Sequence, residues 1–420
     1  MINLLSVGDA LRSTGGVVLA IVILLAMVTI HEFGHYLAGK ILGFKINEFS
    51  IGFGPALWKK RSKTTGELFA VRLIPLGGYC AFDGEDEYET EEETPTEEKQ
   101  ETPFEDFESD GAGTSRTLEK DESVGAGTSV TNEPLESQTV GAGTSVEEEY
   151  PEPKGERFND QAPWKRIIVL IAGATMNYLL ALFIIISMFS FIGQPLYKVV
   201  APKENGYLDS VYEVGDIIES IDGKNLYLIT DYMDVLDGKK AGEEITVGVI
   251  RGEERVDLTV TLKKDCDFVN MSDTNTLLIA MGLDGLYMNT VRYGFFETIG
   301  RSFGYSWKIG GMVLRSFGEL LTGKLGLEAV GGPVTTITVT AEAASSSLLS
   351  FLNVASLIGV NLAVFNLLPI PALDGSKVVF CAIEWIRKKP INRNVETIIH
   401  LVGIVFLFGF AILVDLLKLF

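Results

Sequence analysis

The sequence predicts a polytopic α-helical membrane protein with about four transmembrane helices, a membrane-associated β-hairpin and a small β-rich domain. Apolar residues make up 47% of the 420 residues, and the mean hydropathy is positive, which is typical of a membrane protein with soluble parts. Four long apolar runs follow one another along the chain. Some of the segments between them are short apolar stretches broken by glycine and proline, which indicate strands and turns.

The first segment, residues 1–82, begins with an apolar run that we expect to form a transmembrane helix from roughly Gly15 to Lys40. A signal peptide is the alternative, but no small-residue cleavage site follows the run. On this helix His31 and His35 lie one turn apart on one face and can share a zinc ion, while Glu32 reaches a water molecule on that metal. Ionisable groups at membrane depth are costly, which favours a functional site.

After the first helix, short apolar pieces broken by glycine and proline predict two strands, at residues 49–55 and 68–79. Lysine and arginine between them, at residues 59–63, indicate a tip that faces water. Extended backbone this close to a membrane helix must be buried in protein or line a cavity. We therefore expect a β-hairpin wall beside the metal, and the alternative is a loop outside the membrane.

The formal net charge of −21 is confined to one segment. Residues 83–156 contain 25 acidic and 4 basic residues, so the rest of the chain is neutral. The segment is rich in threonine, serine and proline and contains Gly-Ala-Gly-Thr-Ser three times. We expect an acidic disordered insert over residues 83–160. No basic patch remains that would indicate binding to nucleic acid.

Residues 161–195 form the next predicted segment, a second transmembrane helix. Its apolar run, Ile167 to Ile192, is long enough to span a membrane. The run contains one amide side chain, Asn177. Such a residue usually makes a contact between helices, and the alternative is that it faces the active-site cavity.

Residues 196–265 have the pattern of a soluble domain with short strands separated by turns. Gly-Asp-Ile-Ile at residues 215–218, followed by Ile-Asp-Gly at 221–223, resembles the PDZ family. PDZ domains bind extended peptides by adding them to a sheet edge. The alternative is a β-rich domain that binds no peptide.

Residues 266–345 are predicted to form a linker and an amphipathic helix. Aromatic and aliphatic side chains lie among arginine and lysine over residues 291–322, which is typical of a helix on the membrane surface. The last segment, 346–420, contains the third and fourth apolar runs. A proline-containing turn between them leads to Asp374.

Basic residues give an independent test of the topology. They cluster at residues 40–63, 165–166 and 387–393, and with four spans all three clusters fall on one side of the membrane. The positive-inside rule makes that side cytoplasmic, which leaves the PDZ-like domain outside the cell. The histidine pair and Asp374 then lie at the same depth, near the cytoplasmic side. Catalytic zinc usually has three protein ligands and one open position, so Asp374 is the expected third ligand, although a carboxylate at such a place is ordinarily only a helix cap.

Taken in order, the motif at residues 31–35, the turn at 366–375, the four apolar runs and the PDZ-like segment resemble the site-2 protease family of intramembrane zinc metalloproteases. The match is best to the bacterial regulator of sigma-E protease type and covers nearly everything outside the acidic insert. Two departures are visible. Relatives often have proline after the glycine in the second span, where this chain has Gly173-Ala174, and the acidic insert is unusual.

The resemblance implies a zinc cofactor and a role for each candidate residue. These are His31, His35 and Asp374 as Zn²⁺ ligands, Glu32 as the catalytic base, and Asn366 and Asn361 as the residues that hold the substrate strand.

The predicted function is a zinc metalloprotease in the plasma membrane that cleaves single-pass transmembrane proteins. The resemblance implies an anti-sigma factor or signal-peptide remnants as the substrate. A membrane metal or ion transporter and a catalytically silent PDZ scaffold are the alternatives. Glu32 distinguishes the first of these, because a carrier needs ligands but no base beside the metal.

Overall fold

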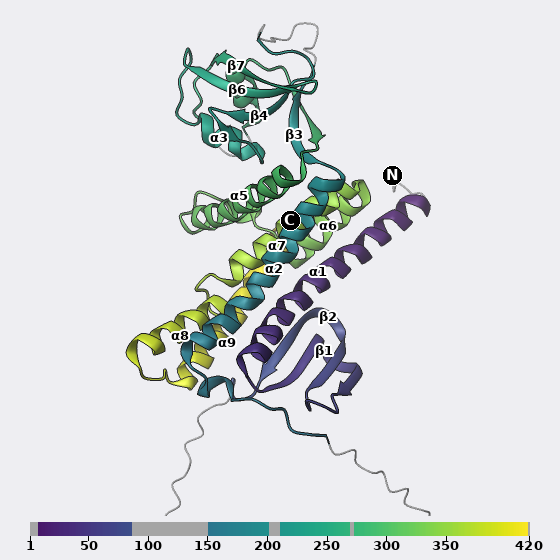
Figure 1. Cartoon of the computed structure of the whole chain (residues 1–420), viewed down its shortest axis with the longest axis vertical. Coiled ribbons are helices and arrows are strands. Elements are labelled where there is room, and N and C mark those ends of the chain that lie inside the picture. The colour runs from purple at the N-terminus through teal and green to yellow at the C-terminus, as the bar shows by residue number, and fades with distance from the viewer. Residues whose placement is uncertain (1–6, 86–149, 201–210, 269–272, 419–420) are drawn as a thin grey trace, which may run out of the picture. The chain divides into compact units, whose positions relative to one another are not determined.

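The computed structural model describes residues 7–85, 150–200, 211–268 and 273–418, so most of the predicted acidic insert lies outside the described residues. Figure 1 shows the elements in their order. The helices are α1 (Val7–Leu42), α2 (Pro163–Phe191), α3 (Ile229–Leu236), α4 (Thr274–Met281), α5 (Phe295–Leu321), α6 (Pro333–Ser346), α7 (Leu348–Asn366), α8 (Asp374–Arg387) and α9 (Arg393–Leu417). The strands are β1 (Ile46–Arg61), β2 (Leu68–Phe82), β3 (Gln194–Val199), β4 (Ile217–Ile221), β5 (Lys224–Asn225), β6 (Glu244–Arg251), β7 (Glu254–Thr261) and β8 (Leu286–Val291).

Four of the described helices are long and apolar enough to cross a membrane, namely α1 from Thr14 onward, α2, α7 and α9. Helix α2 packs between α1 and α7. Glycine permits the close approach of α1 and α2, because a Cβ atom at Gly34 would lie 2.4 Å from the carbonyl oxygen of Ala172. Small residues are typical of helix crossings in membranes. Helix α9 is more peripheral, and its buried residues are Gly403 and Val414.

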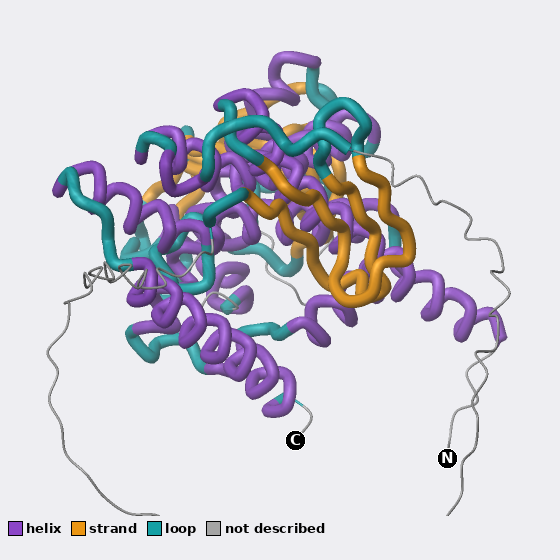
Figure 2. Tube along the Cα trace, turned by 90° about the horizontal axis from the view of Figure 1, so that it is seen from below, coloured by secondary structure: helices purple, strands orange, loops and turns teal. Residues whose placement is uncertain are grey.

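Strands β1 and β2 form an antiparallel pair next to α1 (Figure 2, orange). Each strand pairs with its partner twice. Ser50 lies opposite both Ala70 and Tyr79, and Ala70 also lies opposite Lys59. The expected two-strand hairpin is thus a small sheet in which the start of β2 runs between two parts of β1. Tyr36 of α1 contacts one phenylalanine ring from each strand, so the sheet packs on the half of α1 that carries the histidines.

Both ends of the predicted disordered segment are packed in the structure. Phe158 is buried against Phe44 and a second phenylalanine of the small sheet. Asp83 forms an ion pair with Lys45 at 2.9 Å. The predicted limits of the disordered insert, residues 83 and 160, are therefore too wide. Phe158 and Asp83 make contacts with distant residues, and the acidic composition of the segment does not reveal such contacts.

The β-rich domain is built on antiparallel strands in the order β7-β6-β4-β3-β8, with β5 paired to β4. Its core includes Leu236 of α3 and Met281 of α4. The sheet extends from Gln194 to Val291, so the predicted limits of 196 and 265 are too narrow. Strand β8 is short, and α4 lies between β7 and β8 in the sequence. A pattern of regularly spaced strands therefore does not indicate that β8 belongs to the sheet.

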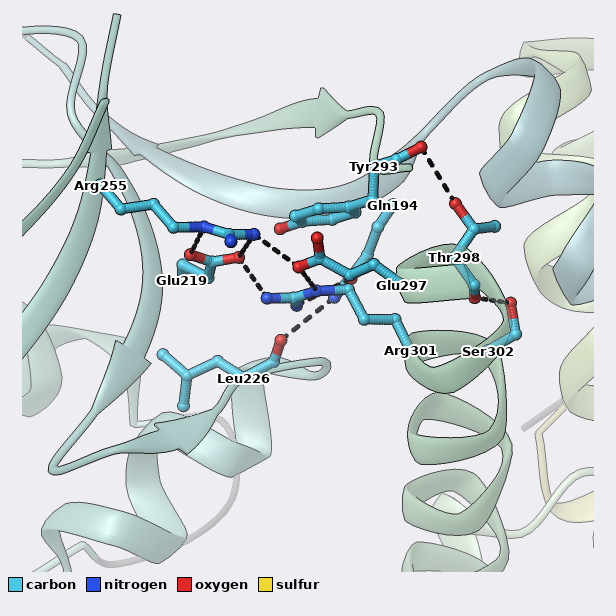
Figure 3. A network of polar contacts seen from close by, with 9 residues as sticks. All are labelled: Gln194, Glu219, Leu226, Arg255, Tyr293, Glu297, Thr298, Arg301 and Ser302. Atoms are coloured by element: carbon cyan, nitrogen blue, oxygen red, sulfur yellow. Dashed lines mark hydrogen bonds and ion pairs between the residues drawn. The ribbon is translucent and has the colours of Figure 1, made fainter. Parts of the chain in front are cut away.

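Helix α5 joins this domain to the apolar helices. Arg301 of α5 is buried and donates to Glu219, and at 3.1 Å to Gln194, both from the domain (Figure 3). Lys308, two turns further on, pairs with Asp231 of α3 at 2.9 Å. Other residues of α5 pack against α2 and α7, and a further face exposes large aromatic side chains. Helix α5 therefore connects the β-rich domain to the apolar helices and keeps one face exposed.

Candidate metal centre

The two motif histidines lie on the face of α1 that packs against α2. Their exposed fractions are 8% for His31 and 7% for His35. One helical turn separates them, and their Nε2 atoms are 3.2 Å apart. The α-helical repeat places side chains four residues apart on one face, so the sequence spacing alone accounts for this convergence.

Asp374 arrives from a different part of the chain. It is the first residue of α8 and follows the loop at residues 367–373, which leaves α7. Its Oδ2 atom lies 3.0 Å from Nε2 of His31 and 3.4 Å from Nε2 of His35. This oxygen is buried and accepts no hydrogen bond from the residues that the structure describes. The three residues form a group whose ligand atoms could hold one metal ion.

The spacing of these atoms fits tetrahedral zinc. Bonds of about 2.0–2.1 Å to histidine nitrogen and carboxylate oxygen place two ligand atoms of a tetrahedron about 3.3 Å apart. The three separations in the structure are 3.0, 3.2 and 3.4 Å. Two imidazoles and a carboxylate are also a donor set that zinc accepts in catalytic sites, with the fourth position left for water.

The outer nitrogen of each histidine is held by α2. Nδ1 of His35 lies 2.8 Å from the carbonyl oxygen of Val169 and donates to it, which leaves the Nε2 lone pair for a metal. Nδ1 of His31 lies 3.2 Å from the amide of Asn177 and 3.4 Å from that of Asn366. With Nε2 facing the metal, this Nδ1 carries a hydrogen and needs an acceptor. The carboxamide oxygen of Asn177 is buried and has no partner among the described residues. It becomes that acceptor when the amide group rotates by half a turn, which exchanges its oxygen and nitrogen.

Gly173 makes room for both rings. A Cβ atom at this position would lie 2.4 Å from Nε2 of His35 and 2.8 Å from Cε1 of His31. Any side chain here would therefore enter the space between the two histidine rings. The missing proline at Ala174 does not alter this feature, since the glycine alone provides the room.

Glu32 lines two cavities, and Asp374 also borders both of them. The larger, of about 450 Å³, is bounded by residues that include Tyr79 of β2 and Lys377 of α8. The smaller, of about 270 Å³, is bounded by residues of α1, α2 and α7 that include Asn177 and Asn366. Glu32 thus borders both cavities that meet Asp374.

The two asparagines assigned to the substrate strand lie in different places. Asn366 ends α7 and borders the smaller cavity beside His31. Asn361 is partly exposed in the middle of α7 and borders neither of the two cavities. Its role stays a prediction from the sequence.

Comparison with known proteins agrees with this geometry. The family model described as "Peptidase family M50" matches residues 19–410 of this chain. The chain belongs to peptidase family M50. The regulator of sigma-W protease RasP of Bacillus subtilis is 28% identical over 442 residues, covering 96% of this chain and 99% of that protein. The zinc metalloprotease RasP of Bacillus licheniformis is 27% identical over 435 residues, with the same coverage. This M50 peptidase is thus an intramembrane zinc metalloprotease.

One solved structure resembles part of this M50 peptidase. It is the PDZ domain of an SdrC-like protein from Listeria monocytogenes, 17% identical, covering 24% of this chain and 90% of that one with a TM-score of 0.16. A similarity of this size assigns no fold by itself. The interpretation of the β-rich domain as PDZ-like therefore rests on its turn motifs.

The sequence patterns of this M50 peptidase indicate only part of the site. Gly173 enters them only as the residue before Ala174, Lys377 belongs to no motif, and Asn177 fits two interpretations. The sequence does contain a signal for Gly173, because Gly173 and Asn177 are four residues apart and so share one face of α2. A glycine and an amide on the same face of an apolar span indicate a polar contact that needs room.

Proposed function

We propose that His31, His35 and Asp374 hold the zinc ion of this protease and that Glu32 is its general base. The observation that carries the proposal is the convergence of three ligand atoms at tetrahedral spacing, with Glu32 lining the same two cavities as Asp374. A transporter would need the ligands but would have no use for the base.

Different groups of the site have different roles in hydrolysis. A zinc ion bound at this site supplies a Lewis acid that activates water and polarises a peptide carbonyl. The carboxylate of Glu32 accepts a proton from the attacking water and then delivers it to the leaving amine. The carbonyl of Val169 and the amide of Asn177 fix the orientation of the two histidine rings.

Substrates are single-pass transmembrane proteins in this proposal. The smaller cavity is bordered by apolar residues of membrane-length helices, such as Val28 and Leu362, together with Asn366. A substrate helix must unwind locally to place its peptide bond there, and Asn366 offers an amide to its freed backbone. Regulation through an anti-sigma factor, or removal of signal-peptide remnants, is the expected role, and the name of the Bacillus subtilis relative as a regulator of sigma-W protease favours the former.

The proposed membrane arrangement has four crossings in the plasma membrane, with the active site near the cytoplasmic side. The basic clusters at residues 40–63, 165–166 and 387–393 support this orientation. The small sheet of β1 and β2 associates with the membrane near the metal. Helix α5 lies along the outer surface, where the exposed Phe296 and Trp307 contact lipid.

The β-rich domain then lies outside the cell and binds extended peptides. Among the described strands β8 is an edge of the sheet, since its partner there is β3. Tyr287 and Met288 on this strand are exposed, with fractions of 68% and 48%. An unpaired edge with exposed side chains is a place where a peptide can add as a further strand.

Replacing single site residues tests the assignment of roles. Glu32→Gln keeps size and hydrogen bonding but removes the proton acceptor, so zinc stays bound while cleavage of a model membrane peptide falls by roughly two to four orders of magnitude. Asp374→Asn replaces an anionic ligand with a neutral amide and lowers zinc retention in a chelator titration as well as cleavage. Active Glu32→Gln protein, or Asp374→Asn protein that holds zinc as the wild type does, would refute the assignment.

A further inference from the structure

The loop that presents Asp374 contains a strained residue. Ala372 has a φ of +79°, in a region that residues with a Cβ atom rarely adopt. Such a conformation persists only where the surrounding structure determines it strongly. The contacts that hold Ala372 therefore bear on the placement of the carboxylate two residues later.

His400 on α9 makes one of these contacts. The backbone N–H of Ala372 donates to Nδ1 of His400 at 3.2 Å. Because Nδ1 accepts, it keeps its lone pair and the ring carries its hydrogen on Nε2. The ring also packs edge-on against Phe380 of α8, with centroids 5.9 Å apart. His400 thus contacts the loop before Asp374 and the helix that begins with it.

Gly403 brings the backbone of α9 against the same loop. It lies one turn after His400, and a Cβ atom here would be 2.5 Å from Cβ of Pro371 and 2.6 Å from its carbonyl carbon. Gly403 is one of the two buried residues of α9, the other being Val414 near the far end. The loop is therefore one of the few places where this otherwise exposed helix makes tight contact.

We infer that His400 is a positioning residue for the metal centre. Together with Gly403 it makes α9 a support that keeps Ala372 in its strained conformation and so directs Oδ2 of Asp374 toward the two ligand histidines. The inference rests on the proposed assignment of Asp374 as a zinc ligand. His400 bonds to the backbone before Asp374, so its loss changes where the carboxylate lies.

Two substitutions at His400 separate the hydrogen bond from packing. His400→Phe keeps a ring against Phe380 but removes the acceptor, and His400→Asn keeps an acceptor near the position of Nδ1 but removes the ring. The full-length chain, purified in detergent, is measured for its zinc dissociation constant by chelator competition, for its unfolding temperature and for cleavage of a model membrane peptide. We expect His400→Phe to raise the zinc dissociation constant by roughly 10- to 100-fold, the usual effect of losing a residue that orients a ligand. His400→Asn restores most of the affinity.

A second pair of variants tests the support without touching the histidine. Gly403→Ala pushes on Pro371 and weakens zinc binding in the same direction as His400→Phe. Gly409→Ala, on the same helix, is the matched control, because a Cβ atom there meets nothing within 4 Å. It leaves zinc binding and cleavage unchanged.

The outcomes distinguish this inference from the site assignment beneath it. If His400→Phe and Gly403→Ala bind zinc as the wild type does, or if His400→Asn loses as much affinity as His400→Phe, the positioning role is refuted. Asp374→Ala serves as the reference in the same titration. Retention of zinc by Asp374→Ala refutes the ligand assignment itself, whereas its loss of zinc beside an unaffected His400→Phe refutes the positioning role alone.

Discussion

Gly173→Ala is expected to damage the metal centre more than it damages the fold. The added methyl group would lie 2.4 Å from Nε2 of His35 and 2.8 Å from Cε1 of His31. Carbon atoms in contact are ordinarily about 3.5 Å apart, so the rings or the backbone of α2 must move by about 1 Å. A displacement of that size at a reacting centre costs roughly 100-fold in rate. We expect cleavage to fall by about that factor and zinc affinity to fall with it.

The free energy of unfolding of the same variant should fall by no more than about 2 kcal/mol. Overpacking costs roughly 1–3 kcal/mol, while alanine gains about 1 kcal/mol over glycine within a helix. The unfolding temperature in detergent is the measurement for the fold, and chelator competition with peptide cleavage reports on the site. Gly311→Ala on α5, where an added Cβ atom meets nothing within 4 Å, is the control. Wild-type zinc affinity and cleavage in Gly173→Ala would refute the argument that this glycine makes room for the ligands.

Two further predictions concern parts of the chain away from the metal. Deletion of residues 89–148 should leave zinc content and unfolding temperature unchanged, because the packed ends around Asp83 and Phe158 remain; loss of metal would mean that the acidic insert contributes to folding. Arg301→Leu should loosen the β-rich domain from α5, since removing one partner of a buried ion pair costs roughly 3–5 kcal/mol, and limited proteolysis should then cut between them faster. Arg315→Leu on the same helix is the control, because the ion pair with the domain that it removes, to Asp234 of α3, is exposed, and such a pair contributes at most about 1 kcal/mol. Equal protection of both variants would contradict the role given to Arg301.

The zinc motif was predictable from the sequence because it is local. Two histidines and a glutamate within one helical turn converge through helix geometry alone, and the fold has only to bury them. Asp374 was predictable for a different reason. The count of apolar runs and the distribution of basic residues placed it at the depth of His31 and His35, and the structure brings its Oδ2 atom within 3.4 Å of both Nε2 atoms.

The parts that the sequence did not reveal depend on contacts between distant segments. The double pairing of Ala70 arises from bends in β1 and β2, and no periodic pattern marks them. Strand β8 is short, and its partner among the described strands is β3, which is far from it in the sequence. To predict the contact of Asn177 with His31, one must know the rotation of α2 about its own axis. An apolar span with little amphipathic pattern does not specify that rotation.

The placement of Asp374 also depends on how the rest of α8 is fixed. Near its end Glu384 pairs with Arg166 of α2, where both side chains have an exposed fraction of 4%, and with Arg393 of α9 at 3.0 Å. Near its start Lys377 pairs with Glu85 at 2.7 Å. Buried ion pairs add little net stability over well-packed apolar residues, but an unpaired partner is costly. We therefore interpret these pairs as contacts that permit one orientation of α8 and penalise others. The proposed ligand Asp374 comes from a separate helix and needs such a constraint, because its carboxylate must meet two histidines whose own positions are set elsewhere in the chain.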